Sequence, residues 1–411
     1  MAGIGWYPNV ASVVNYLPGS LPDSTIVEPR WFPTPDGAVT SGLLYRPASS
    51  TQLVACVMHP RVDCSHHYVI PGLLRAGIAV WGQRSRWVGN DSDLVHERVL
   101  VDIATAHAAL AEEGFSRQLL IGNSGGASLY CLYAQQSLLA AADRLTDDAS
   151  GAKLDLTASM PAPVGLVLLA PHPGQADMLR FAIDPAVVDE SDPGLSDPSL
   201  DMFEPANGFA APPASSSYSE QFLEAYRAAQ LERLRRIDEV ARTALEQQSQ
   251  QRSSGRAGDA PDRRRAQAAR YVVVHRTDAD PRFTDLSLDP SQRAYGSLLG
   301  RRPDITNFGV VGFARLSTPR AWLSTWSFAQ TRAALRLTVP DVDVPALVVG
   351  YRGDPCVFPS EVEAVNRALP AAASPVQWID GDHYGLLDEG ADDTPRRTAV
   401  DVITGWSDAH R

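Results

Sequence analysis

Paired cysteines, long apolar runs and an excess of positive charge are all missing from this 411-residue sequence. The four cysteines, Cys56, Cys64, Cys131 and Cys356, show no spacing typical of a metal site. Three of them lie in or beside segments that are expected to be core strands or helix. We therefore expect reduced, mostly buried thiols and no bound metal.

Targeting and membrane-spanning segments are not apparent either. No stretch reaches the ~18 consecutive apolar residues of a transmembrane helix, and residues 1–20 lack both a basic start and an unbroken apolar core. The formal net charge is −12, which favours neither nucleic acid nor an anionic membrane as a partner. These features predict a cytoplasmic protein whose main partner is a small molecule.

Two common cofactor signatures are absent as well. The glycine-rich run NSGG (123–126) has no lysine of the kind that a P-loop requires, and it is not part of a G-x-G-x-x-G dinucleotide fingerprint. We expect no cofactor. What remains is an ordinary globular composition, with 44% hydrophobic and 20% charged residues, which suits one large core or two domains.

Strands and helices alternate over two parts of the chain. Helices are expected at 93–114, directly after Ser124, and in the closing segment 394–410, because apolar residues recur there at helical spacing. Short apolar runs bounded by turn residues predict strands at 40–46, 52–58, 76–82, 117–123, 164–172, 345–354 and 374–381. The alternation predicts an α/β fold whose mostly parallel sheet has helices on both faces.

The segment 173–340 breaks this rhythm and is interpreted as an insertion between two parts of one core, 1–172 and 341–411. It starts with an irregular stretch rich in proline, aspartate and serine, and 252–265 is expected to be a solvated polar turn. Between them, 218–251 is predicted to be a long helix with an apolar stripe through Phe222, Leu223, Tyr226, Leu234, Ile237, Ala241 and Leu245. The stripe packs within a mainly helical cap or pairs with its copy in a homodimer.

The run IGNSGG (121–126) carries the first chemical signal. Gly122, Ser124 and Gly126 have the G-x-S-x-G spacing of a nucleophile elbow, in which a tight strand-to-helix turn holds a serine hydroxyl over the end of a sheet. A predicted strand precedes the motif and a predicted helix follows it, as this turn requires. Ser124 is the candidate nucleophile.

A serine nucleophile needs a general base and an acidic residue that orients the base. His383 lies in the glycine-flanked segment DGDHYG, just after the last predicted strand, and is the candidate base. Asp354 follows the predicted strand PALVVGY and is the preferred acid, with Asp380, Asp382 and Asp177 as alternatives. All three candidate groups follow strands, and they occur in the order Ser, Asp, His.

With these motifs the sequence resembles the α/β-hydrolase fold superfamily over residues 30–172 and 340–411. The resemblance implies a serine hydrolase with a large cap insertion and a two-donor oxyanion hole. One donor is expected from the N–H of Gly125. The other would come from the loop HPRVDCSHH, where Pro60 cannot donate, so the N–H of Arg61 is the candidate. His59 would then only brace this loop.

Candidate substrate-binding residues come from two segments. In the aromatic run 308–330, Trp322 and Trp326 are expected to line the pocket roof together with other rings, unless these rings form the core of the insertion itself. In the loop 82–93, Arg84 and Trp87 are expected near the same edge, where an arginine grips a substrate carboxylate or braces the loop through a salt bridge.

The expected function is hydrolysis of an ester, lactone or thioester of a mid-sized, largely apolar small molecule through an acyl-enzyme on Ser124. The same triad also serves acyltransferases and hydrolases of amide or C–C bonds. A relative that binds small molecules without catalysis is the remaining alternative.

Overall fold

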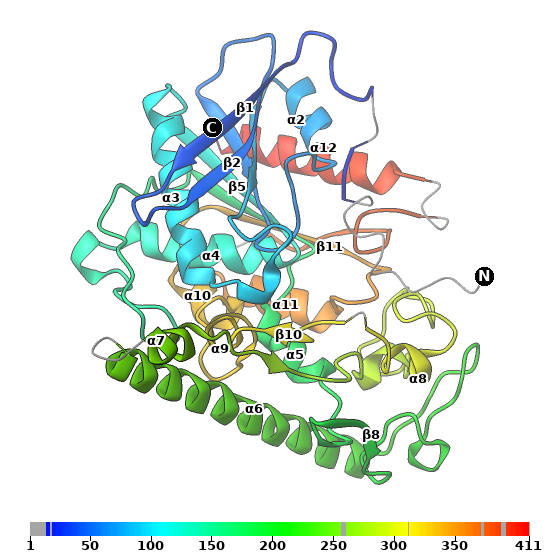
Figure 1. Ribbon diagram of the computed structural model, residues 1–411. Helices are drawn as coiled ribbons and strands as arrows, with labels where there is room; N and C mark the ends of the chain where they lie inside the picture. Colours follow the sequence, from blue (N-terminus) through cyan, green and yellow to red (C-terminus); the bar gives the residue numbers. More distant parts are fainter. Residues whose placement is uncertain are drawn as a thin grey trace.

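A computed structural model describes residues 14–16, 19–255, 260–310, 312–370, 374–387 and 392–410. Within this part of the chain, eight strands form the main sheet in the order β1-β2-β4-β3-β5-β6-β11-β12. Figure 1 shows β1, β2 and β5 of this sheet in the upper half of the view. The strands are β1 (Ile26–Pro33), β2 (Val39–Arg46), β3 (Leu53–Val57), β4 (Ala79–Arg84), β5 (Arg117–Asn123), β6 (Gly165–Leu169), β11 (Ala346–Tyr351) and β12 (Gln377–Ile379). The first two pairings in this order are antiparallel, and all the others are parallel.

Helices cover both faces of the sheet. One face packs against α3 (His96–Glu112), α4 (Gly125–Leu138) and α11 (Pro359–Ala368), and the other packs against α2 (Ile70–Arg75) and α12 (Thr394–Ala409). Side chains alternate between the two layers along a strand. In β3, for example, Val54 and Cys56 join the first cluster, whereas Ala55 and Val57 join the second. The central strands are therefore apolar throughout, which explains their continuous hydrophobic runs.

This architecture confirms the predicted α/β-hydrolase fold. Every strand expected from the sequence is present in the sheet, and β5 has the predicted bounds. β1 is not among the predicted strands, because Pro29 and Pro33 interrupt its apolar pattern. β1 lies at the edge of the sheet and has a neighbouring strand on one side only. Proline is tolerated in such a strand, because the N–H group that it lacks would face solvent. All four cysteines are free and buried, as expected.

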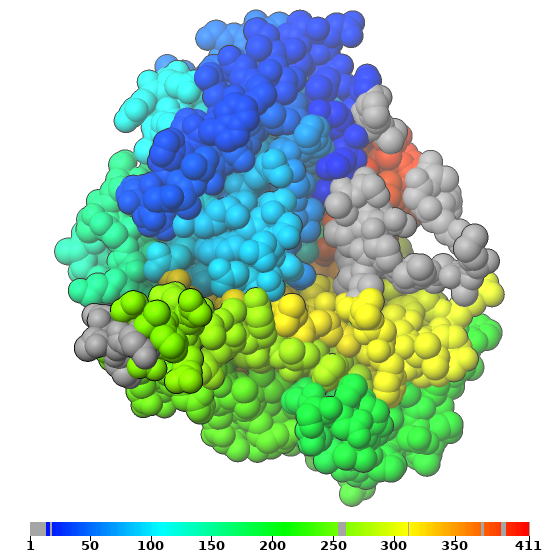
Figure 2. All heavy atoms as spheres, viewed as in Figure 1, coloured from blue at the N-terminus to red at the C-terminus, as the bar shows by residue number. Residues whose placement is uncertain are grey.

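The segment between β6 and β11 contributes no strand to the main sheet among the residues that the structure describes. It contains α5 (Gln175–Ala182), the long helix α6 (Glu220–Gly255), α7 (Ala260–Gln267), α8 (Pro303–Thr306), α9 (Pro319–Ala321) and α10 (Leu335–Thr338). It also holds two small two-stranded sheets, β7 (Val187–Asp189) with β8 (Asp192–Ser196), and β9 (Val272–Val273) with β10 (Leu316–Ser317). Figure 2 shows this segment, in green and yellow, beneath the blue and cyan N-terminal part.

The apolar stripe of α6 is buried within the chain itself. Leu234, Ile237 and Ala241 join a hydrophobic cluster with residues of α5 and the π-helical turn η6 (Trp322–Trp326). Tyr226 belongs to a second, smaller cluster of the insertion. The stripe is therefore used in packing within the insertion. The expected polar turn at 252–265 differs from the structure, because α6 continues to Gly255 and α7 follows; residues 256–259 lie outside the described part.

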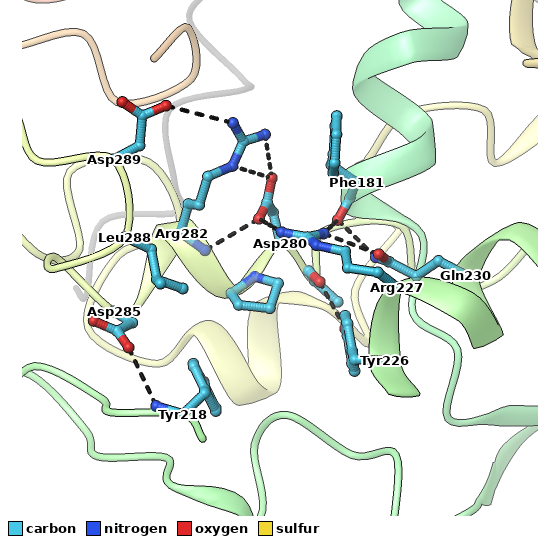
Figure 3. A network of polar contacts seen from close by, with 12 residues as sticks. Phe181, Tyr218, Tyr226, Arg227, Gln230, Asp280, Arg282, Asp285, Leu288 and Asp289 are labelled. Carbon is cyan, nitrogen blue, oxygen red and sulfur yellow. Dashed lines mark hydrogen bonds and ion pairs between the residues drawn. The ribbon is translucent and has the colours of Figure 1, made fainter. Parts of the chain in front are cut away.

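An ionic network centred on the buried carboxylate of Asp280 lies within the insertion (Figure 3). The carboxylate of Asp280 accepts hydrogen bonds from Arg227 on α6 at 2.8 Å and from Arg282 at 2.7 Å. Arg282 also donates to Glu361 on α11 at 2.8 Å. Burial acts to raise the pKa of Asp280, but the two arginines outweigh it and lower that pKa to about 2. The insertion is thereby joined to the helix that follows the Asp354 loop.

None of the described helices combines the length and the apolar character that crossing a membrane requires.

Candidate active site

Ser124 occupies the turn between β5 and α4, with φ 55° and ψ −125°. A positive φ in a residue with a Cβ atom is strained, by roughly 1–3 kcal/mol, and is found where the surrounding structure enforces it. The N–H of Ser124 donates to the carbonyl of Leu169 on the neighbouring strand at 3.0 Å. The strained turn is thus held by the sheet, and it directs the hydroxyl away from the strand.

Two glycines make this turn sterically feasible. A Cβ on Gly122 would lie 2.6 Å from the Cα of Ala127, and a Cβ on Gly126 would lie 2.2 Å from the carbonyl oxygen of Met58. Both contacts are with backbone atoms, which cannot move aside without shifting β3 or α4. The G-x-S-x-G spacing seen in the sequence therefore reflects close packing of strand against helix.

A hydrogen-bonded chain links Ser124 to His383 and Asp354. The Nε2 of His383 lies 2.8 Å from Oγ of Ser124, and its Nδ1 lies 2.6 Å from Oδ2 of Asp354. Both His383 and Asp354 are almost fully buried, with 1% and 2% of the side chain exposed. With Nδ1–H donating to the carboxylate, Nε2 carries the lone pair that accepts the hydroxyl proton.

The structure distinguishes among the acids that the sequence left open. Oδ1 of Asp354 accepts the backbone N–H groups of Cys356 and Val357, both at 2.9 Å, which aims Oδ2 at the imidazole. Asp382 instead caps the backbone of its own turn, and Asp380 pairs with Arg352 at the surface. Asp177, on α5, pairs with Arg336. Asp354 is the carboxylate in contact with the imidazole.

The same region holds the group of potential metal ligands found in the described residues, Asp354, Cys356 and His383, whose ligand atoms lie within 4.8 Å of one another. The carboxylate and imidazole of this group are in direct hydrogen-bond contact at 2.6 Å. Two ligand atoms that each lie ~2.1 Å from one tetrahedral zinc ion would be about 3.4 Å from each other. The arrangement fits a proton-transfer chain better than a metal site.

A cavity of about 530 Å³ opens onto Ser124. Its walls come from the loops that follow the strands and from the insertion, which contributes α5 and Phe313. The lining residues are His59, Arg61, Val62, Asp63, Val88, Gly89, Asp91, Ser124, Gly125, His172, Gln175, Met178, Phe313, Cys356, His383 and Tyr384. This volume suits a small organic molecule.

The N–H of Gly125 fits the first oxyanion-donor prediction. Gly125 is the first residue of α4, so its N–H belongs to the helix terminus and has no intrahelical acceptor. The structure does not support the backbone N–H of Arg61 as the second oxyanion donor. This N–H group donates to Nδ1 of His59 at 3.0 Å. Its guanidinium pairs with Asp91 and lies over the rings of Phe313 and Trp326.

The four residues expected to bind substrate do not line the cavity. Trp322 and Trp326 are buried in the hydrophobic cluster of the insertion, and Nε1 of Trp322 donates to Asp238 at 2.7 Å. Arg84 pairs with Asp63 at 3.0 Å, while Trp87 packs against the sheet core. The two tryptophans of the insertion therefore form part of its core, and Arg84 braces its loop through a salt bridge, as the alternatives to substrate binding stated.

Several cavity residues were not among the predicted site residues. Gln175 and Met178 lie on the short helix α5 directly after β6, and His172 precedes that helix. Burial lowers the pKa of His172 to about 3, so this imidazole is neutral. Their position in the sequence could have identified them. The segment 172–178 follows β6, which is parallel to β5 and next to it, so this segment leaves the sheet at the same edge as Ser124.

Neither a family model nor a curated protein matches the sequence, but solved structures resemble its fold. The esterase domain of a Rhodothermus marinus protein is 12% identical, covering 93% of this chain and 98% of that one, with a TM-score of 0.44. The α/β hydrolase GrgF from Penicillium is 14% identical, covering 92% and 97%, with a TM-score of 0.46. Brefeldin A esterase is 13% identical, covering 98% and 83%, with a TM-score of 0.47. These likenesses concern the fold.

Proposed function

We propose that this chain, which has the α/β-hydrolase fold, is a serine hydrolase that cleaves an ester, lactone or thioester of a mid-sized small molecule. The observation that carries this proposal is the hydrogen-bonded chain from Ser124 through His383 to Asp354, opening onto the cavity. Ser124 attacks the carbonyl carbon while His383 takes its proton. The acyl-enzyme is then hydrolysed by water that the same imidazole activates.

The proposed substrate is largely apolar around the bond that is cleaved. Val62, Val88, Met178 and Phe313 supply apolar surface to the cavity. Arg61 is compensated by Asp91 and is therefore not a free cation for an anionic substrate. The insertion acts as a cap in this proposal, because Gln175, Met178 and Phe313 all belong to it and all line the cavity.

A fluorophosphonate probe tests the proposal directly. The wild-type protein is expected to gain the mass of one phosphonyl group, and peptide mapping is expected to place it on Ser124. Ser124→Ala should show no labelling and lose at least about a thousandfold in ester hydrolysis, with an unchanged melting temperature. A second serine, Ser128, lies buried one turn later on α4 and provides the control Ser128→Ala, which should still be labelled.

A panel of p-nitrophenyl esters of increasing acyl length, assayed with the wild type, would then define the preferred acyl group. A folded wild-type protein that neither reacts with the probe nor hydrolyses any ester of the panel would contradict the proposal and favour a non-catalytic binding protein.

A further inference from the structure

We propose that the side chain of His59 donates the second hydrogen bond of the oxyanion hole through its Nε2–H group. The inference rests on the proposed acyl-transfer function of Ser124 and assigns a further catalytic residue to it. It replaces the backbone donor expected from the loop after β3.

At positions 60–62, next to His59, no backbone N–H group is left for the oxyanion. Pro60 lacks an N–H group. The N–H groups of Arg61 and Val62 both point at Nδ1 of His59, at 3.0 and 2.9 Å. A chain that places proline here therefore needs another donor beside Gly125.

The same two hydrogen bonds determine the tautomer of His59. Because Nδ1 accepts two N–H groups, it cannot carry a proton, and the proton of the neutral ring is on Nε2. Burial holds the pKa of His59 well below its usual value, and the positive charge of Arg61 acts in the same direction. The ring therefore presents Nε2–H as a permanent, uncharged donor.

Nε2 of His59 lies beside Gly125. A Cβ added to Gly125 would lie 2.9 Å from Nε2 of His59 and 2.5 Å from Nε2 of Gln175, so both side chains lie directly against this glycine. His59, Gly125 and Ser124 line the same cavity. Nε2–H therefore lies beside Gly125 in the wall of the cavity onto which Ser124 opens, where it can donate to a carbonyl oxygen under attack by Ser124.

The chemical step follows from this placement. As Oγ of Ser124 bonds to the carbonyl carbon, its proton moves to Nε2 of His383, and the π electrons of the C=O bond move to the carbonyl oxygen. That oxyanion accepts hydrogen bonds from Gly125 N–H and His59 Nε2–H. When the C=O bond re-forms, the bond to the leaving alkoxide breaks, and the alkoxide takes the proton from His383. His59 keeps its own proton throughout.

Two substitutions separate the donor of His59 from its bracing role. In His59→Asn, the amide oxygen replaces Nδ1 as acceptor for the loop, but the donor at the Nε2 position is lost. In His59→Gln, the longer amide places a donor near the Nε2 position, but the loop acceptor is lost. His66→Asn is the matched control, because His66 is an exposed histidine of the same loop.

We expect His59→Asn to keep its melting temperature and its KM for p-nitrophenyl acetate while kcat falls by about 10²–10³. Binding of a trifluoromethyl ketone, whose serine adduct carries an oxyanion, should weaken by a similar factor when it competes with fluorophosphonate labelling. His59→Gln should melt at a lower temperature yet keep kcat within about tenfold of the wild type. His66→Asn should match the wild type in all measurements.

The inference is overturned if folded His59→Asn keeps kcat and ketone affinity within about threefold of the wild type. It is also overturned if both His59 variants lose activity equally and in step with melting temperature, which would mark a purely structural role. If His59→Asn does not fold, a folded His59→Gln with a loss beyond a hundredfold overturns it as well. A wild type that the fluorophosphonate does not label would instead contradict the proposed function itself.

Discussion

The imidazole Nδ1 of His383 lies 2.6 Å from Oδ2 of Asp354, while the other oxygen of this carboxylate accepts two backbone N–H groups. The carboxylate is therefore oriented by the backbone of its own loop, and it orients the imidazole in turn. This relationship explains how a histidine on a glycine-rich loop keeps one tautomer and one direction toward Ser124.

Asp354→Asn is expected to leave the fold intact and lower kcat by about 10⁴. The amide oxygen still accepts the two N–H groups, so the amide nitrogen faces Nδ1 of His383 as a donor. The imidazole proton then moves to Nε2, which can no longer accept from Ser124. Steady-state kinetics and circular dichroism measure the two effects, and a kcat within tenfold of the wild type would argue against Asp354 as the orienting acid.

Gly126→Ala should abolish activity and destabilise the protein, because the new Cβ would lie 2.2 Å from the Met58 carbonyl oxygen and force β3 and α4 apart. The control is Gly405→Ala in α12, where a Cβ meets nothing within 4 Å. That helical position should gain about 0.5–1 kcal/mol in unfolding free energy. Urea unfolding and ester hydrolysis should therefore separate the two variants; equal behaviour of both would contradict the packing argument.

Phe313→Ala is expected to change specificity, because this ring lines the cavity. KM for p-nitrophenyl octanoate should rise about tenfold, which corresponds to losing part of an aromatic contact, while KM for p-nitrophenyl acetate stays within about twofold. Phe308→Ala is the control, since Phe308 is half exposed and does not line the cavity. Equal effects on the two esters would mean that Phe313 does not contact the acyl chain.

Trp322→Ala should act on stability instead. The indole is fully buried in the insertion and donates to Asp238, whose pKa is raised by burial. Its removal should cost about 3–5 kcal/mol of unfolding free energy. Thermal melting would show the loss, and the ratio of octanoate to acetate kcat/KM in the folded fraction should remain that of the wild type. A changed ratio without destabilisation would restore the specificity role expected from the sequence.

His107 should make the protein sensitive to mild acid. Its ring is buried against Tyr130 and Tyr133 with no hydrogen-bond partner for either nitrogen among the described residues, and burial lowers its pKa to about 3. The unfolded chain binds this proton near pH 6.5 and the folded chain only near pH 3. Stability is therefore full above about pH 6.5 and falls as pH decreases toward 3, by about 1.4 kcal/mol per unit for this group.

His107→Phe removes that proton site while it keeps a ring in the core. From about pH 7.5 to 5.5 the variant should lose about 1.4 kcal/mol less unfolding free energy than the wild type. Urea unfolding at the two pH values measures this difference. Parallel losses in the two proteins would show that His107 is not the group responsible.

Local patterns in the sequence were sufficient for every strand of the sheet except β1, and for the hydrogen-bonded residues Ser124, His383 and Asp354. Continuous apolar runs report burial on both faces of a strand, and Ser124 and Asp354 follow such runs, in β5 and β11. His383 follows the short edge strand β12, whose first two residues are only half-buried. Parallel strands end at one edge of a sheet, so these positions converge whatever the loops do. β1 escaped the same reasoning because its prolines break the pattern, which only an edge position tolerates.

The cavity wall and the proposed oxyanion donors depend on tertiary structure. Trp322 and Phe313 belong to one aromatic run, yet one ring is buried in the insertion and the other faces the cavity, because the direction of each is set by helices far away in the chain. Likewise, the sequence HPRV does not predict that the N–H groups of Arg61 and Val62 both donate to Nδ1 of His59. The sequence alone determined which groups reach the edge of the sheet. Where each side chain points was decided by packing and hydrogen bonds between distant segments, because those contacts join residues that no local sequence pattern connects.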